Sequence, residues 1–287
     1  MTIGKLRKLG ILTDSISDLP DSIAKEHGIW ILPVKLHIDE KTYLDKVEIT
    51  DEEFFKILVD GKAQTKTSQP SPYDFQVIFE KMLKEYEVII AIHASSELSG
   101  TFHSAVMALQ SIGDDASRIH LFDTKQASMG EGLMVIKAAE MARDGAEPKQ
   151  IISELEKVAA NIRTRFVPDT LTYLQRGGRI GKASAFLGNI LNIKPLLGVD
   201  KVVYPVEKIR GSRNVVPKLV EELKSDLKPQ DKFMACILNL NMNEDAAELQ
   251  KAVEADERFH GLVHAKVGAT IGCHIGPKAI GLIWYRM

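Results

Sequence analysis

Only two cysteines occur in the sequence, Cys236 and Cys273, and they form neither a CxxC pair nor a disulfide framework. A reducing compartment, the cytoplasm, is therefore expected. The formal net charge is only -2, which argues against a protein-wide field for nucleic acid or for an anionic membrane. The first apolar run stops at Thr13-Asp14, too soon for a signal segment or a spanning helix. We expect no nucleic-acid partner and no integral membrane segment.

Familiar catalytic patterns are missing as well. The G-x-S-x-G nucleophile elbow is absent, because Glu97-Leu98-Ser99-Gly100 lacks its first glycine. The stretch Arg176-Gly177-Gly178-Arg179-Ile180-Gly181-Lys182 has an arginine where a phosphate-binding loop needs glycine. No second histidine, cysteine or carboxylate stands at metal-ligand spacing from His274. The sequence therefore predicts neither a nucleotide loop nor a metal site.

The composition indicates an ordinary globular protein of two domains. Of its 287 residues, 45% are hydrophobic and 26% are charged, so neither disorder nor a fibrous architecture is needed. A length prior of roughly 100–200 residues per domain favours two α/β domains. We place them at residues 1–165 and 166–287. No Pro-rich linker separates the halves, so we expect a tight interface between them.

Strand-like and helix-like segments alternate in the first half, which predicts a layered α/β domain with a mostly parallel sheet. Thr50 with Glu53, and Ser71 with Asp74, have the spacing of helix capping boxes. Strands are predicted around residues 11–12, 29–38, 88–92 and 119–123, and helices at about 18–27, 50–61, 71–85, 128–144 and 148–164.

The second half has a different order, in which short helices come before a strand hairpin. Two short helices are expected within residues 171–192, around Arg176-Gly177-Gly178-Arg179. A hairpin is expected about Asp200-Lys201. It joins strands at residues 195–199 and 202–206, and helices follow at 212–227 and 243–255, with further strands at 233–240, 262–267 and 281–285.

Three polar turns bounded by Gly or Pro carry the functional signal. They are Lys66-Thr67-Ser68-Gln69-Pro70-Ser71-Pro72, Ser95-Ser96-Glu97-Leu98-Ser99-Gly100-Thr101, and Cys273-His274-Ile275-Gly276-Pro277. The first two contain more hydroxyls than two helix caps require. Each precedes a predicted helix, whose N-terminal end suits an anion. The second also follows a buried strand, at the sheet edge where ligands of α/β proteins bind.

Two alternative functions use the same residues. A serine hydrolase would need Ser99 as nucleophile, His274 as base, and Asp14 or Asp123 to orient that base. Cys273 with His274 is a weaker candidate pair, because neighbours on an extended segment point to opposite faces. Separately, residues 165–224 hold eleven Lys or Arg against five Asp or Glu. This excess fits a solvated face, a phosphate-bearing or acidic partner, or a regulatory protein that reads lipid state.

Taken together, six motifs in order resemble the DegV family of bacterial fatty-acid-binding proteins along nearly the whole chain. They are Thr13-Asp14-Ser15, Lys66-Thr67-Ser68-Gln69-Pro70-Ser71, Ser95-Ser96-Glu97-Leu98-Ser99-Gly100-Thr101, Arg176-Gly177-Gly178-Arg179-Ile180, Asn192-Ile193-Lys194-Pro195 and His274-x-Gly276-Pro277. The resemblance implies two α/β domains with one long-chain fatty acid between them. It also implies a carrier with no catalytic residue and no cofactor, which presents its ligand to a separate ATP-binding subunit of a fatty acid kinase for acyl phosphate formation and phospholipid synthesis.

Residue roles follow from the same resemblance. Thr67, Ser68 and Ser99 would hold the fatty acid carboxylate with His274 nearby, and Arg179 and Arg210 would contact the kinase subunit. Three positions depart from the family pattern. Ile16 and Ile275 stand where a small hydroxyl residue is usual, and Glu131 replaces an apolar residue, which would alter chain selectivity if it faced the ligand.

The energetics of an amphiphile agree with this interpretation. Burying an alkyl chain contributes about 0.8 kcal/mol per methylene, so ten methylenes supply roughly 8 kcal/mol. A neutral hydrogen bond to the head group adds only about 1 kcal/mol, and a charge-assisted one about 3 kcal/mol. We therefore expect affinity to come from the apolar walls and positioning from Thr67, Ser99 and His274. Hydroxyl donors would hold a carboxylate without a fixed countercharge and leave one oxygen free to attack ATP.

Overall fold

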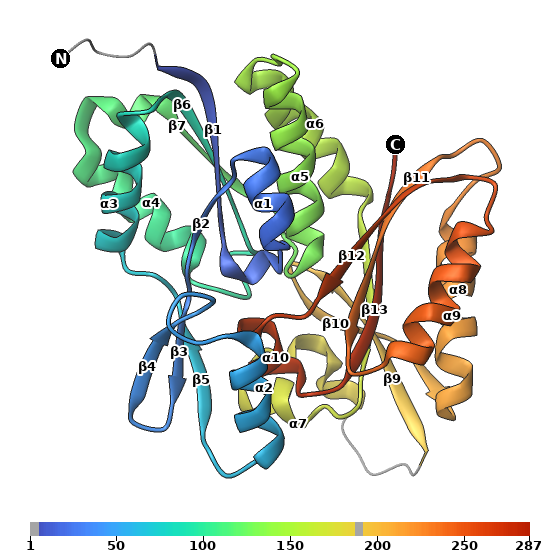
Figure 1. Cartoon of the computed structure of the whole chain (residues 1–287). Coiled ribbons are helices and arrows are strands. Elements are labelled where there is room, and N and C mark those ends of the chain that lie inside the picture. The colour runs from blue at the N-terminus through green and yellow to red at the C-terminus, as the bar shows by residue number, and fades with distance from the viewer. Residues whose placement is uncertain (1–5, 187–191) are drawn as a thin grey trace.

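The protein is described by a computed structural model over residues 6–186 and 192–287, and it has a mixed α/β architecture (Figure 1). Its first sheet has the strand order β2-β1-β6-β7, and all neighbours in it are parallel. The expected parallel sheet of the first half is thus confirmed. Its strands are β1 (Arg7–Asp14), β2 (Trp30–Leu32), β6 (Tyr86–His93) and β7 (Ile119–Asp123).

Helices cover both faces of this parallel sheet, as the continuous apolar character of β6 requires (Figure 1). On one side lie α3 (Pro72–Leu83) and α4 (Thr101–Ile112). On the other side lie α1 (Asp21–His27), α5 (Met129–Arg143) and α6 (Pro148–Asn161).

The second half builds a six-stranded mixed sheet with the order β10-β9-β8-β13-β11-β12. The predicted hairpin is confirmed, since β9 and β10 pair antiparallel about Asp200 and Lys201. Helices α8 (Val215–Asp226) and α9 (Asn243–Glu254) lie together beside this sheet. The strands are β8 (Arg163–Pro168), β9 (Ile193–Asp200), β10 (Val202–Arg210), β11 (Phe233–Leu240), β12 (Phe259–Lys266) and β13 (Ala279–Arg286).

A third, small antiparallel sheet was not expected from the sequence. It has the order β4-β3-β5, with β3 at Lys35–Ile38, β4 at Lys41–Leu44 and β5 at Thr65–Ser68. Strand β5 is the first part of the polar stretch 66–72, which therefore starts as a strand and only then enters a helix. Three helices lie near this sheet: α2 (Asp51–Asp60), α7 (Thr172–Arg176) and α10 (Ala269–Ile275).

Predictions that depend on residues close together in the sequence are confirmed at two helix starts. Both capping boxes form, at Thr50 with Glu53 and at Ser71 with Asp74. The single strand expected over residues 29–38 was wrong. It is interrupted at Pro33, which has no amide hydrogen to donate, and its two parts join different sheets.

The helix predicted over residues 148–164 is too long at its C-terminal end. The helix stops at Asn161, and Arg163–Pro168 forms β8 because it pairs with β13 on one side and with β9 on the other. In residues 171–192 the structure has α7 and a 3-10 helix, Gly181–Phe186. The rest of that prediction, at 187–191, lies outside the described residues.

Helix α5 joins the two large sheets into one hydrophobic core. It contacts β1 and β6 of the first sheet and β11 and β13 of the second. Ten of its fifteen residues are buried, among them Leu133, Met134 and Val135. The tight interface expected between the halves is therefore present. Strand β8 crosses residue 165, and the domain boundary placed there stays a prediction.

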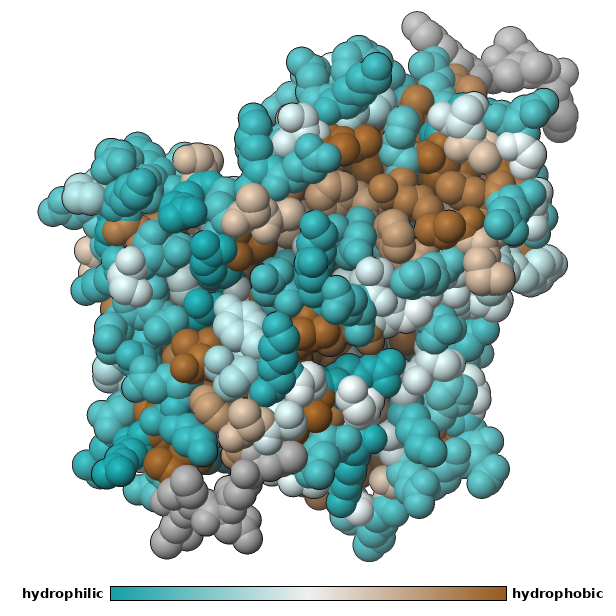
Figure 2. Space-filling model, turned by 180° about the vertical axis from the view of Figure 1, so that it is seen from behind, coloured by the Kyte–Doolittle hydropathy of each residue, from teal (hydrophilic) through white to brown (hydrophobic). Residues whose placement is uncertain are grey.

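The back of the molecule carries a hydrophobic area, in the upper right of Figure 2, on the side that α3 and α4 occupy. Exposed apolar side chains on these two helices are Tyr73, Val77, Val106 and Met107. In the described ranges, no helix has the length and apolar character needed to cross a bilayer.

Candidate functional site

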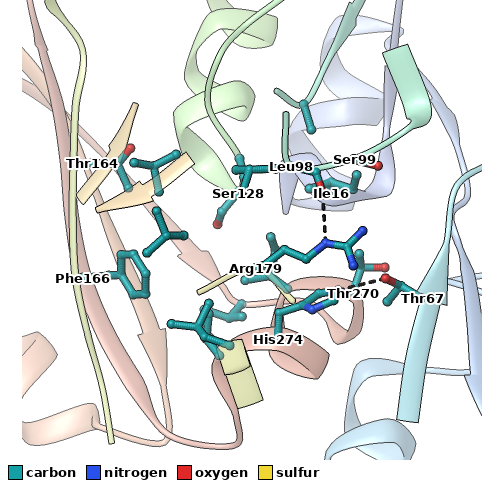
Figure 3. Close-up of a pocket in the computed structure, with 18 of the residues that line it drawn as sticks. Ile16, Thr67, Leu98, Ser99, Ser128, Thr164, Phe166, Arg179, Thr270 and His274 are labelled. Carbon is teal, nitrogen blue, oxygen red and sulfur yellow. Dashed lines mark hydrogen bonds between the residues drawn. The ribbon is translucent and has the colours of Figure 1, made fainter. Parts of the chain in front are cut away.

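A pocket with mostly apolar walls lies between the parallel sheet and the six-stranded sheet, and Figure 3 shows its lining. Its walls come from both halves of the chain. The sequence analysis expected a ligand between two α/β domains, and a pocket in this position agrees with that expectation. The aliphatic and aromatic lining residues are Ile16, Val34, Ala94, Leu98, Ala127, Phe166, Leu174, Val199, Val203, Leu238, Val267, Ile271, Ile275, Ala279 and Ile280. Such walls favour an alkyl chain over a polar ligand.

One end of the pocket is polar. There the Thr67 Oγ1 atom of β5 lies 2.8 Å from His274 Nε2 of α10 (Figure 3). The two residues are 207 positions apart in the sequence, so only the fold brings them together. Thr67, Ser99 and His274, which the family resemblance implies as a group, all line the pocket.

His274 is held as a neutral ring. Burial lowers its pKa to about 4, and the positive charge of Arg179 acts in the same direction. The Nδ1 atom is buried and has no hydrogen-bond partner among the described residues. It faces Gly177, where an added Cβ would lie 2.2 Å from Nδ1. Glycine at position 177 is therefore what allows the ring to sit at this depth.

The hydrogen bonding of the neutral ring assigns its proton. Because an unpaired buried acceptor costs less than an unpaired buried N–H donor, we place the proton on Nε2. Nε2 then donates to Thr67 Oγ1, and the hydroxyl hydrogen of Thr67 remains available for a ligand oxygen. His274 thereby orients Thr67 as a donor.

In the polar turn at residues 95–101, some hydroxyls hold the turn together and another faces the pocket. Ser95 Oγ donates to the Lys201 carbonyl at 2.6 Å, and Ser96 Oγ donates to Asp123 at 2.7 Å. These two hydroxyls stabilise the turn. Ser99 Oγ lies 2.8 Å from Thr101 Oγ1 and lines the pocket. Ser99 is thus the serine of this turn that is placed to meet a ligand.

Ser68 has a different environment from Thr67. It lines the pocket, but its Oγ atom lies 2.7 Å from His37 Nε2 of the neighbouring strand β3. Side chains alternate along a strand, so Ser68 and Thr67 point to opposite faces of β5. Its predicted contact with a carboxylate stays a prediction.

Arg179 lies in the pocket wall, which the sequence did not predict. Its Nε atom donates to the Leu98 carbonyl at 3.1 Å and its Nη1 atom to the Gly177 carbonyl at 2.7 Å. Figure 3 shows the guanidinium between Ser99 and His274. That a carboxylate is held without a fixed countercharge stays a prediction, and Arg179 brings a positive charge to this end of the pocket. The turn Gly177-Gly178, with a positive φ of 68° at Gly178, returns the chain so that Arg179 reaches the site.

Arg210 is exposed at the end of β10 and does not line the apolar pocket. Three of the eleven cations in residues 165–224 form ion pairs with described carboxylates. The pairs are Arg165 with Glu222, Lys194 with Asp169, and Lys218 with Glu207. The contacts of Arg179 and Arg210 with a partner protein stay predictions.

The hydrolase arrangement is not assembled among the described residues. His274 bonds to Thr67 while Ser99 bonds to Thr101. The two candidate orienting acids are also engaged elsewhere: Asp14 with His93, and Asp123 with Ser96.

Residues 273 and 274 lie in helix α10, so the assumption of an extended segment there was wrong. Burial raises the pKa of the Cys273 thiol. A raised pKa disfavours the thiolate that a cysteine nucleophile needs.

The three departures from the family pattern fall in two places. Ile16 and Ile275 line the apolar pocket and extend its hydrophobic wall. Glu131 is fully buried and is not among the described lining residues; its Oε1 atom accepts from Thr13 Oγ1 at 2.8 Å. Burial and the nearby Asp14 raise the pKa of Glu131 well above its ordinary value.

Asp14, His93 and Glu131 form a buried group that sequence spacing does not reveal. One oxygen or nitrogen from each lies within 4.8 Å of the others, a grouping of a kind that can hold a metal ion. In the structure His93 Nδ1 already bonds to Asp14 at 2.8 Å. The three come from β1, β6 and α5, so their proximity depends on the fold. The prediction of no metal stays a prediction.

Comparison with known proteins agrees with this architecture. The model of the DegV family matches residues 8–287. The chain belongs to the DegV family. A DegV domain-containing protein of Caldanaerobacter subterraneus is 35% identical over 280 residues, covering 97% of this chain and 99% of the relative.

Two solved DegV structures superpose along nearly the full chain. A DegV family protein from Thermus thermophilus, described as binding fatty acid, has a TM-score of 0.91 and 32% identity, with 98% of this chain and 100% of that one covered. DegV of Bacillus subtilis, described as a fatty acid binding protein, has a TM-score of 0.86, the same identity and the same coverage. The two-domain DegV fold is therefore the fold of this chain.

Proposed function

We propose that this DegV protein binds a long-chain fatty acid, with the acyl chain in the apolar pocket and the carboxylate at its polar end. The observation that carries the proposal is a pocket with aliphatic walls that ends at Thr67, Ser99, Arg179 and His274. The fatty acid binding described for the Thermus and Bacillus relatives supports it. The apolar walls supply most of the affinity, because each buried methylene contributes about 0.8 kcal/mol.

We further propose that the bound carboxylate is presented to a separate ATP-dependent kinase subunit, so that the protein is a carrier and not itself an enzyme. One carboxylate oxygen would attack the terminal phosphorus of ATP on that subunit, the phosphorus–oxygen bond to ADP would break, and an acyl phosphate for phospholipid synthesis would result. The exposed Arg210 is available for partner contact. The free, buried cysteines Cys236 and Cys273 fit a cytoplasmic location.

The most direct test is chemical identification of the ligand. We expect organic extraction of the purified protein, followed by mass spectrometry, to release long-chain fatty acid. The stripped protein should take up added fatty acid at one equivalent. An empty extract together with no uptake would reject the proposal.

A second experiment tests the head-group residues. Thr67→Val and Ser99→Ala should each weaken binding by about 1 kcal/mol, roughly fivefold, because one hydrogen-bond donor is lost. Ser117→Ala is the matched control, since Ser117 is exposed and donates only to the Asp114 carbonyl. Binding unchanged in both head-group variants would assign the carboxylate to other residues.

A further inference from the structure

Two carboxylates and one imidazole form a fully buried group at the carboxyl ends of β1 and β6. Asp14 ends β1, His93 ends β6, and Glu131 lies in the first turn of α5. All three side chains are inaccessible to solvent. One ligand atom from each lies within 4.8 Å of the others. The group is separate from the apolar pocket, because none of the three is among its described lining residues.

The negative charge of this group has no fixed countercharge. Within residues 6–186 and 192–287, neither Asp14 nor Glu131 pairs with a lysine or an arginine. His93 contacts Asp14, but a histidine is charged only when it is protonated. Two ionised carboxylates that are buried together are strongly disfavoured. The folded protein must therefore bring a positive charge into the group, either as a proton or as a metal ion.

Two atoms of the group have no partner for their polar character. Glu131 Oε2 and His93 Nε2 are buried and form no hydrogen bond with a described residue. The other polar atoms are held in place. Glu131 Oε1 accepts from Thr13 Oγ1 at 2.8 Å, Asp14 Oδ1 accepts from the Ile16 amide at 3.0 Å, and Asp14 Oδ2 lies 2.8 Å from His93 Nδ1. Buried polar atoms are nearly always satisfied in native folds, and a bound ion is one way to satisfy them.

The donor atoms of the group select the kind of ion. Imidazole nitrogen together with carboxylate oxygen suits Zn²⁺, which lies about 2.0–2.2 Å from such ligands. Ligand atoms around one tetrahedral ion are then roughly 3.4 Å apart, so small side-chain shifts would bring the three residues to that spacing. Calcium needs about six to eight oxygen ligands, and magnesium usually keeps several waters. A fully buried group of three side chains suits neither of these two ions.

We propose that Asp14, His93 and Glu131 bind one Zn²⁺ ion in a structural site that ties α5 to the ends of β1 and β6. Because the three ligands meet only in the packed fold, the ion is taken up during folding. Ile16 and Ala94, which follow Asp14 and His93 closely in the chain, line the apolar pocket. The site thus fixes two segments of the pocket wall. The inference rests on this buried group and is independent of the fatty acid proposal.

Refolding of the whole chain tests the site, because a buried ion must enter as the protein folds. The protein is unfolded in urea with a chelator and refolded with Zn²⁺, with Mn²⁺ or with the chelator alone. Bound metal is then measured by mass spectrometry of the elements. We expect one equivalent of zinc in the wild type and less than about a tenth of that in Glu131→Gln, which loses a ligand. Glu140→Gln is the matched control, since Glu140 lies on the same helix outside the group and should keep the zinc.

Thermal unfolding of the same samples gives a second measurement. Zinc at about 100-fold above its Kd should raise the unfolding midpoint of the wild type by roughly 5 °C. The midpoints of Glu131→Gln and His93→Gln should not respond, and His93→Gln supplies the comparison if Glu131→Gln does not fold. A wild-type protein that holds no zinc and does not respond to it would show that a proton neutralises the group, and would overturn the site. Equal zinc responses in the wild type and both variants would place the ion on other residues, and a preference for Mn²⁺ would overturn the zinc assignment.

Discussion

Gly177 gives the sharpest test of how the polar end of the pocket works. Its backbone, at φ -76° and ψ -6°, suits alanine as well as glycine, so Gly177→Ala adds no backbone strain. The new Cβ, however, would lie 2.2 Å from His274 Nδ1 and 2.9 Å from Cε1. Ordinary contact needs more than about 3.4 Å, so the imidazole must move by roughly 1 Å. A displacement of that size breaks the 2.8 Å bond to Thr67.

We expect Gly177→Ala to weaken fatty acid binding by about 1 to 3 kcal/mol, or roughly 5- to 150-fold in Kd. The lower value applies if Thr67 merely loses its orientation, and the upper if the charged hydrogen bond to the carboxylate is lost as well. Isothermal titration of stripped protein measures the change. The free energy of unfolding should also fall, by about 1 kcal/mol, because the bond between Thr67 and His274 is present in the protein without ligand.

A double-mutant cycle with His274→Ala isolates the mechanism. If Gly177 acts through the imidazole, adding Gly177→Ala to the His274→Ala protein changes Kd no further. Additive losses would refute the reasoning, because Gly177 would then act independently of the imidazole. Full affinity in Gly177→Ala alone would also refute it, because the ring would then have room to move without disturbing Thr67.

Three further predictions use buried groups and the apolar walls. Burial raises the pKa of Asp18 to about 7 from 3.8, so the folded protein keeps a proton that the unfolded chain releases above pH 4. The contribution of Asp18 to the free energy of unfolding should therefore fall by about 3 kcal/mol between pH 5 and pH 8. Urea titrations of the wild type and of Asp18→Asn measure it as the difference between their pH dependences, because Glu131 also has a raised pKa. Fatty acids that differ by two methylenes should differ roughly 15-fold in Kd in a competition assay until the pocket is filled; a flat series would contradict apolar walls as the source of affinity. Burial also raises the pKa of Cys236, so a thiol reagent should label it only at the rate of unfolding, and fast labelling of folded protein would contradict its buried position.

Interactions between near neighbours were predictable from the sequence. The capping boxes at Thr50 and Ser71 depend on residues three positions apart, and both form. The apolar run of β6 specified a strand buried on both faces, and the strand lies inside the parallel sheet. The order of strands and helices then predicted the α/β class, because parallel strands need crossover connections.

The candidate site required the tertiary structure for its key details. The resemblance to the DegV family grouped Thr67, Ser99 and His274, but no local rule joins Thr67 to a histidine 207 residues away. Arg179 appeared in the sequence as part of a basic surface segment. The turn at Gly178 and the carbonyls of Leu98 and Gly177 direct it into the pocket instead.

The sequence alone thus determined the layered α/β class, the helix starts, and the three polar turns that hold the candidate ligand residues, because these depend on periodicity and on contacts within a few residues. The tertiary structure decided which polar atoms remain available. It places Ser95 and Ser96 in structural bonds, pairs Ser68 with His37, and keeps His274 neutral by burial. Whether a side chain has a hydrogen-bond partner, is buried or carries a charge depends on residues that are distant in the chain. Only the packed fold brings those residues together.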